Sequence, residues 1–145
     1  MRERFWELPL EQLDEREWEA LCDGCGRCCL VKLEDEDSGE IAFTNVACAY
    51  LDSVRCRCTV YAERQRHVPD CVQVTIAMAR DLDWLPGTCA YRLRARGQAL
   101  RAWHPLISGR ADSVHRAGIG VAGRVIAETG VAEADLEEHI VHWIH

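Results

Sequence analysis

The apolar positions of the chain fall into short stretches, and the first stretch has the spacing of a helix. Its apolar members share one helical stripe: Leu10, Leu13, Trp18 and Leu21. Asp14 followed by Glu17 is an N-cap and N3 pair, and acidic residues in a first turn suit the helix dipole. We therefore predict a helix that begins at about Leu10 or Glu15, ends at Leu21 and is stopped by the glycines that follow.

Two strand-like stretches come next, with an acidic segment between them. Residues 30–33 and 41–44 are apolar and of strand length, so together they predict a hairpin. The acidic segment 34–40 lacks the D-x-[DN]-x-[DN]-G ligand pattern of an EF-hand. It is therefore expected to be a solvated turn rather than a calcium site.

The middle of the chain predicts three short helical segments. Residues 61–67 have the pattern of a helical turn. Asp70 is placed to cap a second helix that begins near Cys71. Thr88 is the predicted N-cap of a third helix, which ends at Gly97.

The tail differs in kind because it contains no cysteine beyond residue 89. Residues 103–109 predict an extended turn packed on the core, and residues 121–126 predict a strand. An amphipathic helix is expected from residue 132 to the end. We therefore expect a cysteine-cluster core over residues 1–109 and a C-terminal extension over residues 110–145 that packs on the same domain.

Length and charge limit the classes of protein that fit. A chain of 145 residues with these short elements predicts one small, loop-rich α+β domain stabilised by metal. The formal charge of −7 argues against general nucleic-acid binding. The longest apolar runs are too short to span a bilayer, and residues 1–7 lack the apolar run of a secretory signal, so the cytoplasm is the expected compartment.

Nine cysteines carry the candidate chemistry, and four of them lie within Cys22–Cys29. A reducing cytoplasm disfavours structural disulfides, and an odd number leaves one thiol unpaired, so metal ligation explains the pattern better. Thiolates bind zinc, copper(I) and iron–sulfur clusters. All nine are candidate ligands: Cys22, Cys25, Cys28, Cys29, Cys48, Cys56, Cys58, Cys71 and Cys89.

Spacing alone leaves the metal open. Adjacent side chains at Cys28 and Cys29 diverge, so they suit two neighbouring sites or a sulfur that bridges two metals. Two four-cysteine zinc sites use eight thiols, whereas a three-metal cluster with bridging sulfurs uses all nine. The C-x2-C-x2-C run from Cys22 also matches the opening of bacterial ferredoxins, without their following Cys-Pro. Zinc ions and an iron–sulfur cluster therefore both remain candidate cofactors.

The cysteine pattern resembles that of a known bacterial family. The run Cys22-x-x-Cys25-x-x-Cys28-Cys29, with the downstream segments 45–48, 56–61, 69–71 and 88–92, is similar to the YkgJ/YcgN-type cysteine-cluster proteins. The Trp-His-Pro-Leu run at 103–106 fits the YcgN branch. The resemblance implies zinc or iron chelation without a settled activity. A related motif in flagellin lysine methylases is associated with an iron–sulfur cluster, but the long methylase chain is absent here.

Other constellations are weaker. Gly118-x-Gly120-x-x-Gly123 matches the dinucleotide fingerprint without the strand, helix and acidic residue that it needs, so it predicts a turn. The terminal histidines are expected to form a polar helix edge: His139, His142 and His145. His104 is placed to donate a hydrogen bond to a cysteine sulfur near the cluster.

Three functions compete at this stage. The first is a structural or metal-handling protein that binds metal ions through the cysteine cluster. The second is an iron–sulfur protein with a redox or cofactor-dependent catalytic role. The third is a thiol-dependent enzyme, which requires one exposed cysteine with a lowered pKa beside a base. No residue is singled out as catalytic, and no protein partner is indicated.

Overall fold

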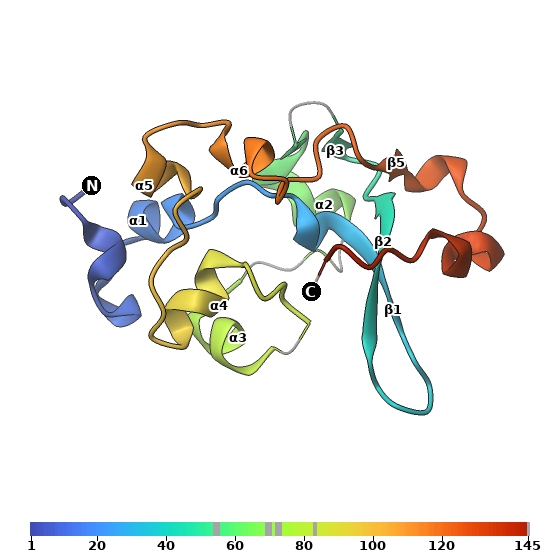
Figure 1. The fold of residues 1–145 in the computed structure, drawn as a ribbon, viewed down its shortest axis with the longest axis horizontal. Coiled ribbons are helices and arrows are strands. Elements are labelled where there is room, and N and C mark those ends of the chain that lie inside the picture. Colours follow the sequence, from blue (N-terminus) through green and yellow to red (C-terminus); the bar gives the residue numbers. More distant parts are fainter. Residues whose placement is uncertain (54–55, 69–70, 72–73, 83, 145) are drawn as a thin grey trace. The chain divides into compact units, whose positions relative to one another are not determined.

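The computed structural model describes residues 1–53, 56–68, 71, 74–82 and 84–144. It contains short helices and small sheets, which confirms the α+β class expected from the sequence. The chain divides into two compact units: unit 1 comprises Met1–Gly24 and Gln73–Ile119, and unit 2 comprises Cys25–Val72 and Gly120–His145. Each unit is described by itself (Figure 1). The division of the chain at residue 109 stays a prediction.

Unit 1 opens with two 3-10 turns and a capped helix. The turns are η1 (Phe5–Glu7) and η2 (Leu10–Gln12), and the helix is α1 (Glu15–Ala20). The Asp14 carboxylate accepts a hydrogen bond from the Glu17 backbone N–H at 2.8 Å, and the Asp14 N–H donates to Glu17 Oε1 at 3.0 Å. This reciprocal pair is a capping box, and it confirms the predicted start of the helix.

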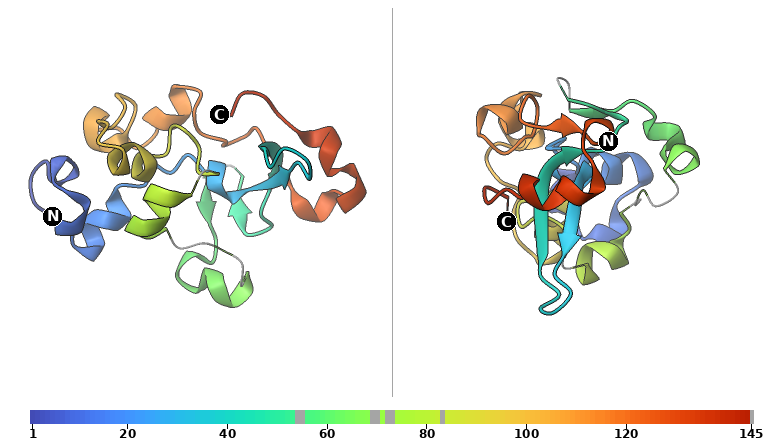
Figure 2. Two further views of the ribbon diagram at one scale, coloured as in Figure 1. Left: turned by 90° about the horizontal axis from the view of Figure 1, so that it is seen from below. Right: turned by 90° about the vertical axis from the view of Figure 1, so that its right-hand side faces the viewer.

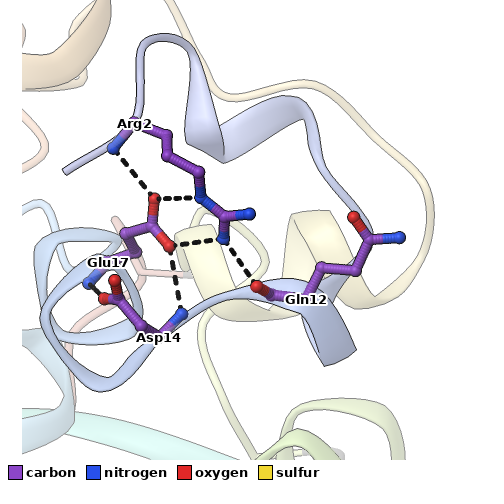
Figure 3. A network of polar contacts seen from close by, with 4 residues as sticks. All are labelled: Arg2, Gln12, Asp14 and Glu17. Atoms are coloured by element: carbon purple, nitrogen blue, oxygen red, sulfur yellow. Dashed lines mark hydrogen bonds and ion pairs between the residues drawn. The ribbon is translucent and has the colours of Figure 1, made fainter.

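The buried carboxylate of Glu17 also fixes the start of the chain (Figure 3). Its side chain is 0% exposed and binds the Arg2 guanidinium through Oε1 at 2.7 Å and Oε2 at 3.1 Å. The Arg2 backbone N–H donates to the same Oε2 at 3.1 Å, and Arg2 Nη2 donates to the Gln12 carbonyl at 2.6 Å. The hydrogen bonds from Arg2 are the main reason that the pKa of Glu17 falls to about 2.

Four further helices of unit 1 surround one apolar core. They are α3 (Ile76–Asp81), α4 (Ala90–Ala95), α5 (Pro105–Ser108) and α6 (Ser113–Arg116). The Trp18 indole N–H donates to the Val74 carbonyl at 3.0 Å, and the Tyr91 hydroxyl donates to the Trp18 carbonyl at 2.9 Å. These bonds join α1 to the segments around α3 and α4. The buried core residues are Phe5, Leu10, Leu21, Ala79 and Tyr91.

The helix expected to start near Cys71 begins later. Its first helical residue is Ile76, because the Thr75 hydroxyl accepts a hydrogen bond from the Met78 N–H at 3.2 Å and caps the helix there. Asp70, the expected cap, lies outside the described residues.

Two further boundaries differ from the expectation. Cys89 rather than Thr88 is the N-cap residue of α4, which ends before Gly97. The segment expected to be an extended turn at 103–109 contains the one-turn helix α5, because His104 caps it and Pro105 occupies its first position.

Unit 2 is built on the predicted hairpin. Strands β1 (Leu30–Glu34) and β2 (Ile41–Ala47) pair antiparallel, and β5 (Ile126–Ala127) adds to β2 in parallel, giving the order β1-β2-β5. Figures 1 and 2 show the hairpin with its long turn at the far end. The hairpin and its solvated turn are therefore confirmed.

Shorter elements complete unit 2. Strands β3 (Leu51–Asp52) and β4 (Arg57–Cys58) form a second, two-stranded antiparallel sheet. The predicted helical turn at 61–67 is present as η4 (Tyr61–Glu63) followed by α2 (Arg64–His67). The remaining turns are η3 (Arg27–Cys29), η5 (Glu128–Gly130) and η6 (Glu133–His139). The buried core of the unit consists of Leu30, Phe43, Ala47, Cys56, Val121 and Ile144.

The terminal amphipathic helix expected from residue 132 onward is present only as the 3-10 helix η6, which ends at His139. Beyond it, Ile140 makes a β-bridge with Thr44. The Val141 N–H donates to the Phe43 carbonyl at 2.9 Å. Pairing with β2 outweighs the helical pattern, because it supplies the backbone hydrogen bonds that a helix would have made internally.

The strand expected over 121–126 is reduced to its last position. Within residues 121–127, only Ile126 and Ala127 pair with β2. Val121 is instead buried in the core, and its N–H donates to the Cys25 carbonyl at 2.9 Å. Across the described ranges, no helix has the length and apolar character needed to cross a membrane.

Candidate metal centre

The turn that carries the first cysteines of unit 2 requires glycine at position 26. Gly26 has φ 77° and precedes η3, and the Cys29 N–H closes the turn on the Gly26 carbonyl at 3.0 Å. A Cβ at this position would overlap Cys56 Sγ and lie 2.8 Å from Val121 Cγ2. The missing side chain therefore leaves the space that the Cys56 sulfur occupies.

Cys25 and Cys56 form a buried pair beside this turn. The Cys56 thiol donates to the Cys25 carbonyl at 3.2 Å, although Cys56 must hold a left-handed φ of 57° to do so. The Cys25 sulfur accepts a hydrogen bond from the Arg27 backbone N–H at 3.5 Å. An N–H directed at a sulfur stabilises negative charge on it, which is the form that binds metal.

Strand pairing brings four more cysteines of unit 2 together. Leu30 pairs with Ala47 in the hairpin, and the next residues outward are joined because the Cys48 N–H donates to the Cys29 carbonyl at 2.9 Å. Cys58 enters the same region through the two-stranded sheet, where it pairs with Leu51. Cys28 precedes Cys29 in η3 and is exposed to solvent.

Neighbouring thiols contribute to a raised pKa at two cysteines of unit 2, Cys29 and Cys71. The pKa of Cys29 is raised far above its ordinary value, first by its hydrogen bond to Cys28, then by burial, and then by repulsion from Cys28, Cys48 and Cys58. The pKa of Cys71 is raised chiefly by burial, with repulsion from Cys58, Cys48 and Cys28, while Arg64 opposes the increase. We call these five residues the thiol group: Cys28, Cys29, Cys48, Cys58 and Cys71.

Negative charge on the neighbouring sulfurs opposes the ionisation of Cys29 and Cys71, and a nearby cation would offset this repulsion. A bound metal ion supplies that cation, and a coordinating thiol is then deprotonated outright. Soft sulfur donors suit zinc and iron–sulfur clusters rather than calcium or magnesium. The donor chemistry of the thiol group therefore fits zinc or iron. As the side chains stand, however, no three His, Cys, Asp or Glu residues among those described could hold one metal ion.

The other candidate ligands lie in unit 1. Cys22 is exposed at the end of α1, where its N–H donates to the Glu19 carbonyl at 3.4 Å. Cys89 is half-buried at the start of α4 and packs against the core of unit 1. The boundary between the two units thus falls inside the predicted cysteine run, directly after Gly24.

The expected hydrogen bond from His104 to a cysteine sulfur is wrong, because both of its ring nitrogens bond to backbone groups. It is 2% exposed, its Nδ1 accepts from the Leu106 N–H at 3.0 Å, and its Nε2 lies 2.7 Å from the Leu21 carbonyl. Because Nδ1 accepts, Nε2 carries the proton and donates to Leu21. His104 therefore holds the residue that precedes Cys22 rather than a metal ligand.

Among the described residues, His139 and His142 belong to no group of three side chains that could hold a metal ion. His139 is half-buried at the end of η6, His142 is exposed, and His145 lies outside the described residues. Gly118 and Gly123 both have positive φ and belong to a turn, as predicted. No strand–helix unit follows them in the described part of the chain.

Lys32 is a residue that the sequence reasoning missed. Its ammonium donates to the Cys28 and Leu30 carbonyls, each at 2.9 Å, and it interacts electrostatically with the thiols of Cys28 and Cys29. Burial lowers the pKa of Lys32, while the two thiols oppose that change. The signal was available, because Lys32 is the single lysine of the chain and stands four residues after Cys28.

Sequence comparison defines the class of protein. Residues 21–90 match the CxxCxxCC family model, described as "Putative zinc- or iron-chelating domain". This match confirms the resemblance to the cysteine-cluster proteins. No solved structure matches the chain significantly.

Near full-length relatives define the family itself. A UPF0260 protein of Cellvibrio japonicus is 57% identical over 141 residues, covering 97% of this chain and 96% of the relative. UPF0260 proteins of Azotobacter vinelandii and Rhodopseudomonas palustris are 54% and 55% identical, covering 96% and 98% of this chain and 94% and 85% of those relatives. The chain therefore belongs to the UPF0260 family.

Proposed function

We propose that this chain binds zinc or iron through thiolates, with the thiol group of unit 2 as the principal ligand set. The observation that carries the proposal is the convergence of cysteines from separate segments of the chain: the Cys48 N–H donates to the Cys29 carbonyl, and Cys58 enters through the two-stranded sheet. A metal cation bound among several thiolates offsets the repulsion between their negative charges. The family's description as zinc- or iron-chelating supports the same conclusion.

Five thiols exceed the four ligands of one tetrahedral zinc ion. The arrangement suits either a centre with more than one metal or a four-ligand site with one sulfur in reserve. Cys25 is a further ligand candidate, because a backbone N–H already points at its sulfur. The contributions of Cys22, Cys56 and Cys89 stay predictions.

A thiol nucleophile is less well supported at two positions of the group. A reactive cysteine needs a lowered pKa, whereas Cys29 and Cys71 both have raised values. These directions argue against a nucleophilic role for Cys29 and Cys71. The cytoplasm, which keeps thiols reduced, stays the predicted compartment.

Anaerobic purification followed by elemental analysis for zinc, iron and inorganic sulfide tests the proposal. Bound zinc without sulfide indicates mononuclear or bridged zinc sites, and iron with sulfide in equal amounts indicates an iron–sulfur cluster. Protein that carries neither metal, and takes up neither on reconstitution, would contradict the proposal.

Serine substitution locates the ligands. Cys48→Ser and Cys58→Ser should each lower the metal content, because both residues belong to the thiol group. Thr59→Ser is the matched control, since it changes the residue beside Cys58 but keeps the hydroxyl that donates to the Tyr50 carbonyl at 2.8 Å. Full metal content in both cysteine variants would remove the thiol group from the ligand set.

A further inference from the structure

The ammonium of Lys32 lies at the point where the turn η3 passes into β1. Its two carbonyl acceptors, on Cys28 and Leu30, flank Cys29 on either side. The pairing of β1 with β2 is irregular between Leu30 and Lys32, and the lysine side chain folds back along its own strand. The last carbonyls of a helical turn lack internal partners, and Lys32 satisfies one of them at Cys28.

The opposite strand fixes the ammonium from the other side. Phe43 is the cross-strand neighbour of Lys32, and Lys32 Nζ lies 5.4 Å from the centroid of its ring. Phe43 is itself buried in the core of unit 2. A cation held between an aromatic face and two carbonyls has little freedom to move away.

The position is also electrostatically specific. The ammonium donates to the carbonyls of Cys28 and Leu30, on either side of Cys29, so its positive charge lies beside this cysteine pair and favours negative charge on the sulfurs. Groups that orient and compensate metal ligands without touching the metal commonly change metal affinity by about 10–100-fold.

We propose that Lys32 is the positioning residue of the Cys28–Cys29 pair, fixing the turn through two carbonyls and compensating the negative charge of the metal-bound thiolates. This inference rests on the proposed metal binding by the thiol group. It assigns to the single lysine of the chain a role in setting affinity, without making it a ligand.

The test compares variants that separate charge from packing. Lys32→Met keeps the apolar stem over Phe43 and removes the charge and both donors, whereas Lys32→Arg keeps the charge. Arg66→Gln, an exposed residue of α2, controls for the loss of one positive charge elsewhere in unit 2. Zn²⁺ affinity is measured by competition with a chromophoric chelator, and Co²⁺ substitution reports the number of thiolates through sulfur-to-metal absorption.

We expect Lys32→Met to weaken Zn²⁺ binding by about tenfold or more. Lys32→Arg and Arg66→Gln should stay within about threefold of the unchanged protein, because each leaves a positive charge beside the thiol pair. The difference between Lys32→Met and the unchanged protein should narrow at high salt, since screening weakens charge compensation. A purely structural role would instead lower the affinity of Lys32→Met and Lys32→Arg together and without salt dependence.

The outcomes separate the two proposals. Unchanged protein that shows no Co²⁺–thiolate absorption and no Zn²⁺ uptake would overturn metal binding itself. Unchanged protein that binds metal, with Lys32→Met equal to it, would overturn the role of Lys32 alone. If Lys32→Met does not fold, Lys32→Gln, which keeps an N–H donor for one carbonyl, gives the same comparison.

Discussion

Replacing Gly26 by alanine tests the geometry of the cysteine turn most directly. The substitution adds one methyl group at a residue with φ 77°, in a position where that group overlaps Cys56 Sγ and lies 2.8 Å from Val121 Cγ2. Neither neighbour can yield easily. Cys56 and Val121 are 5% and 0% exposed, and both belong to the core of unit 2.

Two costs add up at this position. The left-handed conformation costs an L-residue about 1–2 kcal/mol. Inserting a methyl group into a packed core costs a further 1–3 kcal/mol or so. We therefore expect Gly26→Ala to lower the free energy of unfolding by about 2–5 kcal/mol, a large share of the roughly 5–15 kcal/mol of a typical domain.

Gly123→Ala is the matched control. Gly123 lies in the same unit with φ 72°, and a Cβ built there has no heavy atom within 4 Å. It should show only the conformational cost of about 1–2 kcal/mol. The difference between the two variants then measures the overlap with the Cys56 sulfur and Val121.

Urea unfolding of the reduced, metal-loaded protein, followed by circular dichroism, gives both values. Equal destabilisation by Gly26→Ala and Gly123→Ala would refute the close approach of the Cys56 sulfur. A double-mutant cycle sharpens the result, because Cys56→Ala removes the sulfur and should reduce the cost of Gly26→Ala by 1 kcal/mol or so. Strict additivity of the two substitutions would place the cost elsewhere.

Three other predictions concern the capping box, the buried histidine and the metal. The pKa of Glu17 falls from 4.5 to about 2 beside Arg2, so its carboxylate stabilises unit 1 fully above pH 4.5 and progressively less as the pH falls toward 2. In urea titrations at several pH values, Glu17→Gln should lack this part of the acid dependence. An unchanged pH profile would contradict the pairing of Glu17 with Arg2. His104→Ala should lower the free energy of unfolding by about 2–4 kcal/mol, because the Leu21 carbonyl and the Leu106 N–H both lose a buried partner. His104→Asn can still accept from the Leu106 N–H and should recover part of this loss in the same assay. No recovery would argue against the capping role of His104. Chelation of the reduced protein should abolish much of its near-UV circular dichroism and lower its thermal midpoint, since structural metal sites contribute roughly 10 kcal/mol or more of apparent binding energy. The same near-UV spectrum and thermal midpoint with and without metal would show that folding does not depend on metal binding.

Local signals in the sequence predicted the elements that depend on neighbouring residues. Asp14 and Glu17 stand three positions apart, and the structure contains the capping box that this spacing indicates. The hairpin likewise follows from two apolar stretches and one polar turn. Both elements are decided by contacts within a short segment, which a single sequence displays.

The C-terminal segment shows where such signals fail. Its apolar spacing predicts a helix, yet Ile140 forms a β-bridge with Thr44, and the Val141 N–H donates a hydrogen bond to the Phe43 carbonyl of β2. Strand β2 lies almost a hundred residues earlier in the chain, so no local sequence pattern predicts this pairing. Tertiary pairing overrides weak helical preference in segments of this length.

The candidate site was predictable in its chemistry but not in its grouping. Nine thiols are visible in the sequence, whereas their assignment to a group depends on strand register, such as Leu30 opposite Ala47 and Leu51 opposite Cys58. The sequence predicted that the glycines after Leu21 stop the first helix. It did not predict that the Cys56 sulfur, thirty positions later, occupies the space beside the Gly26 Cα. Lys32 stands out in the sequence as the single lysine, but its carbonyl acceptors are known only from the fold.

The core of unit 2 has a consequence for how this protein is made. Seven of the nine cysteines of the chain belong to Cys25–Val72. The core of unit 2 also includes Val121 and Ile144 from a later part of the chain. Ribosomes synthesise the chain from its N-terminus at about 5–20 residues per second. The thiols therefore emerge seconds before the residues that cover them, and unit 2 can complete its core only after Ile144 has been synthesised. During that interval the nascent chain presents uncovered sulfurs to whatever metal ions, reductants or oxidants surround the ribosome.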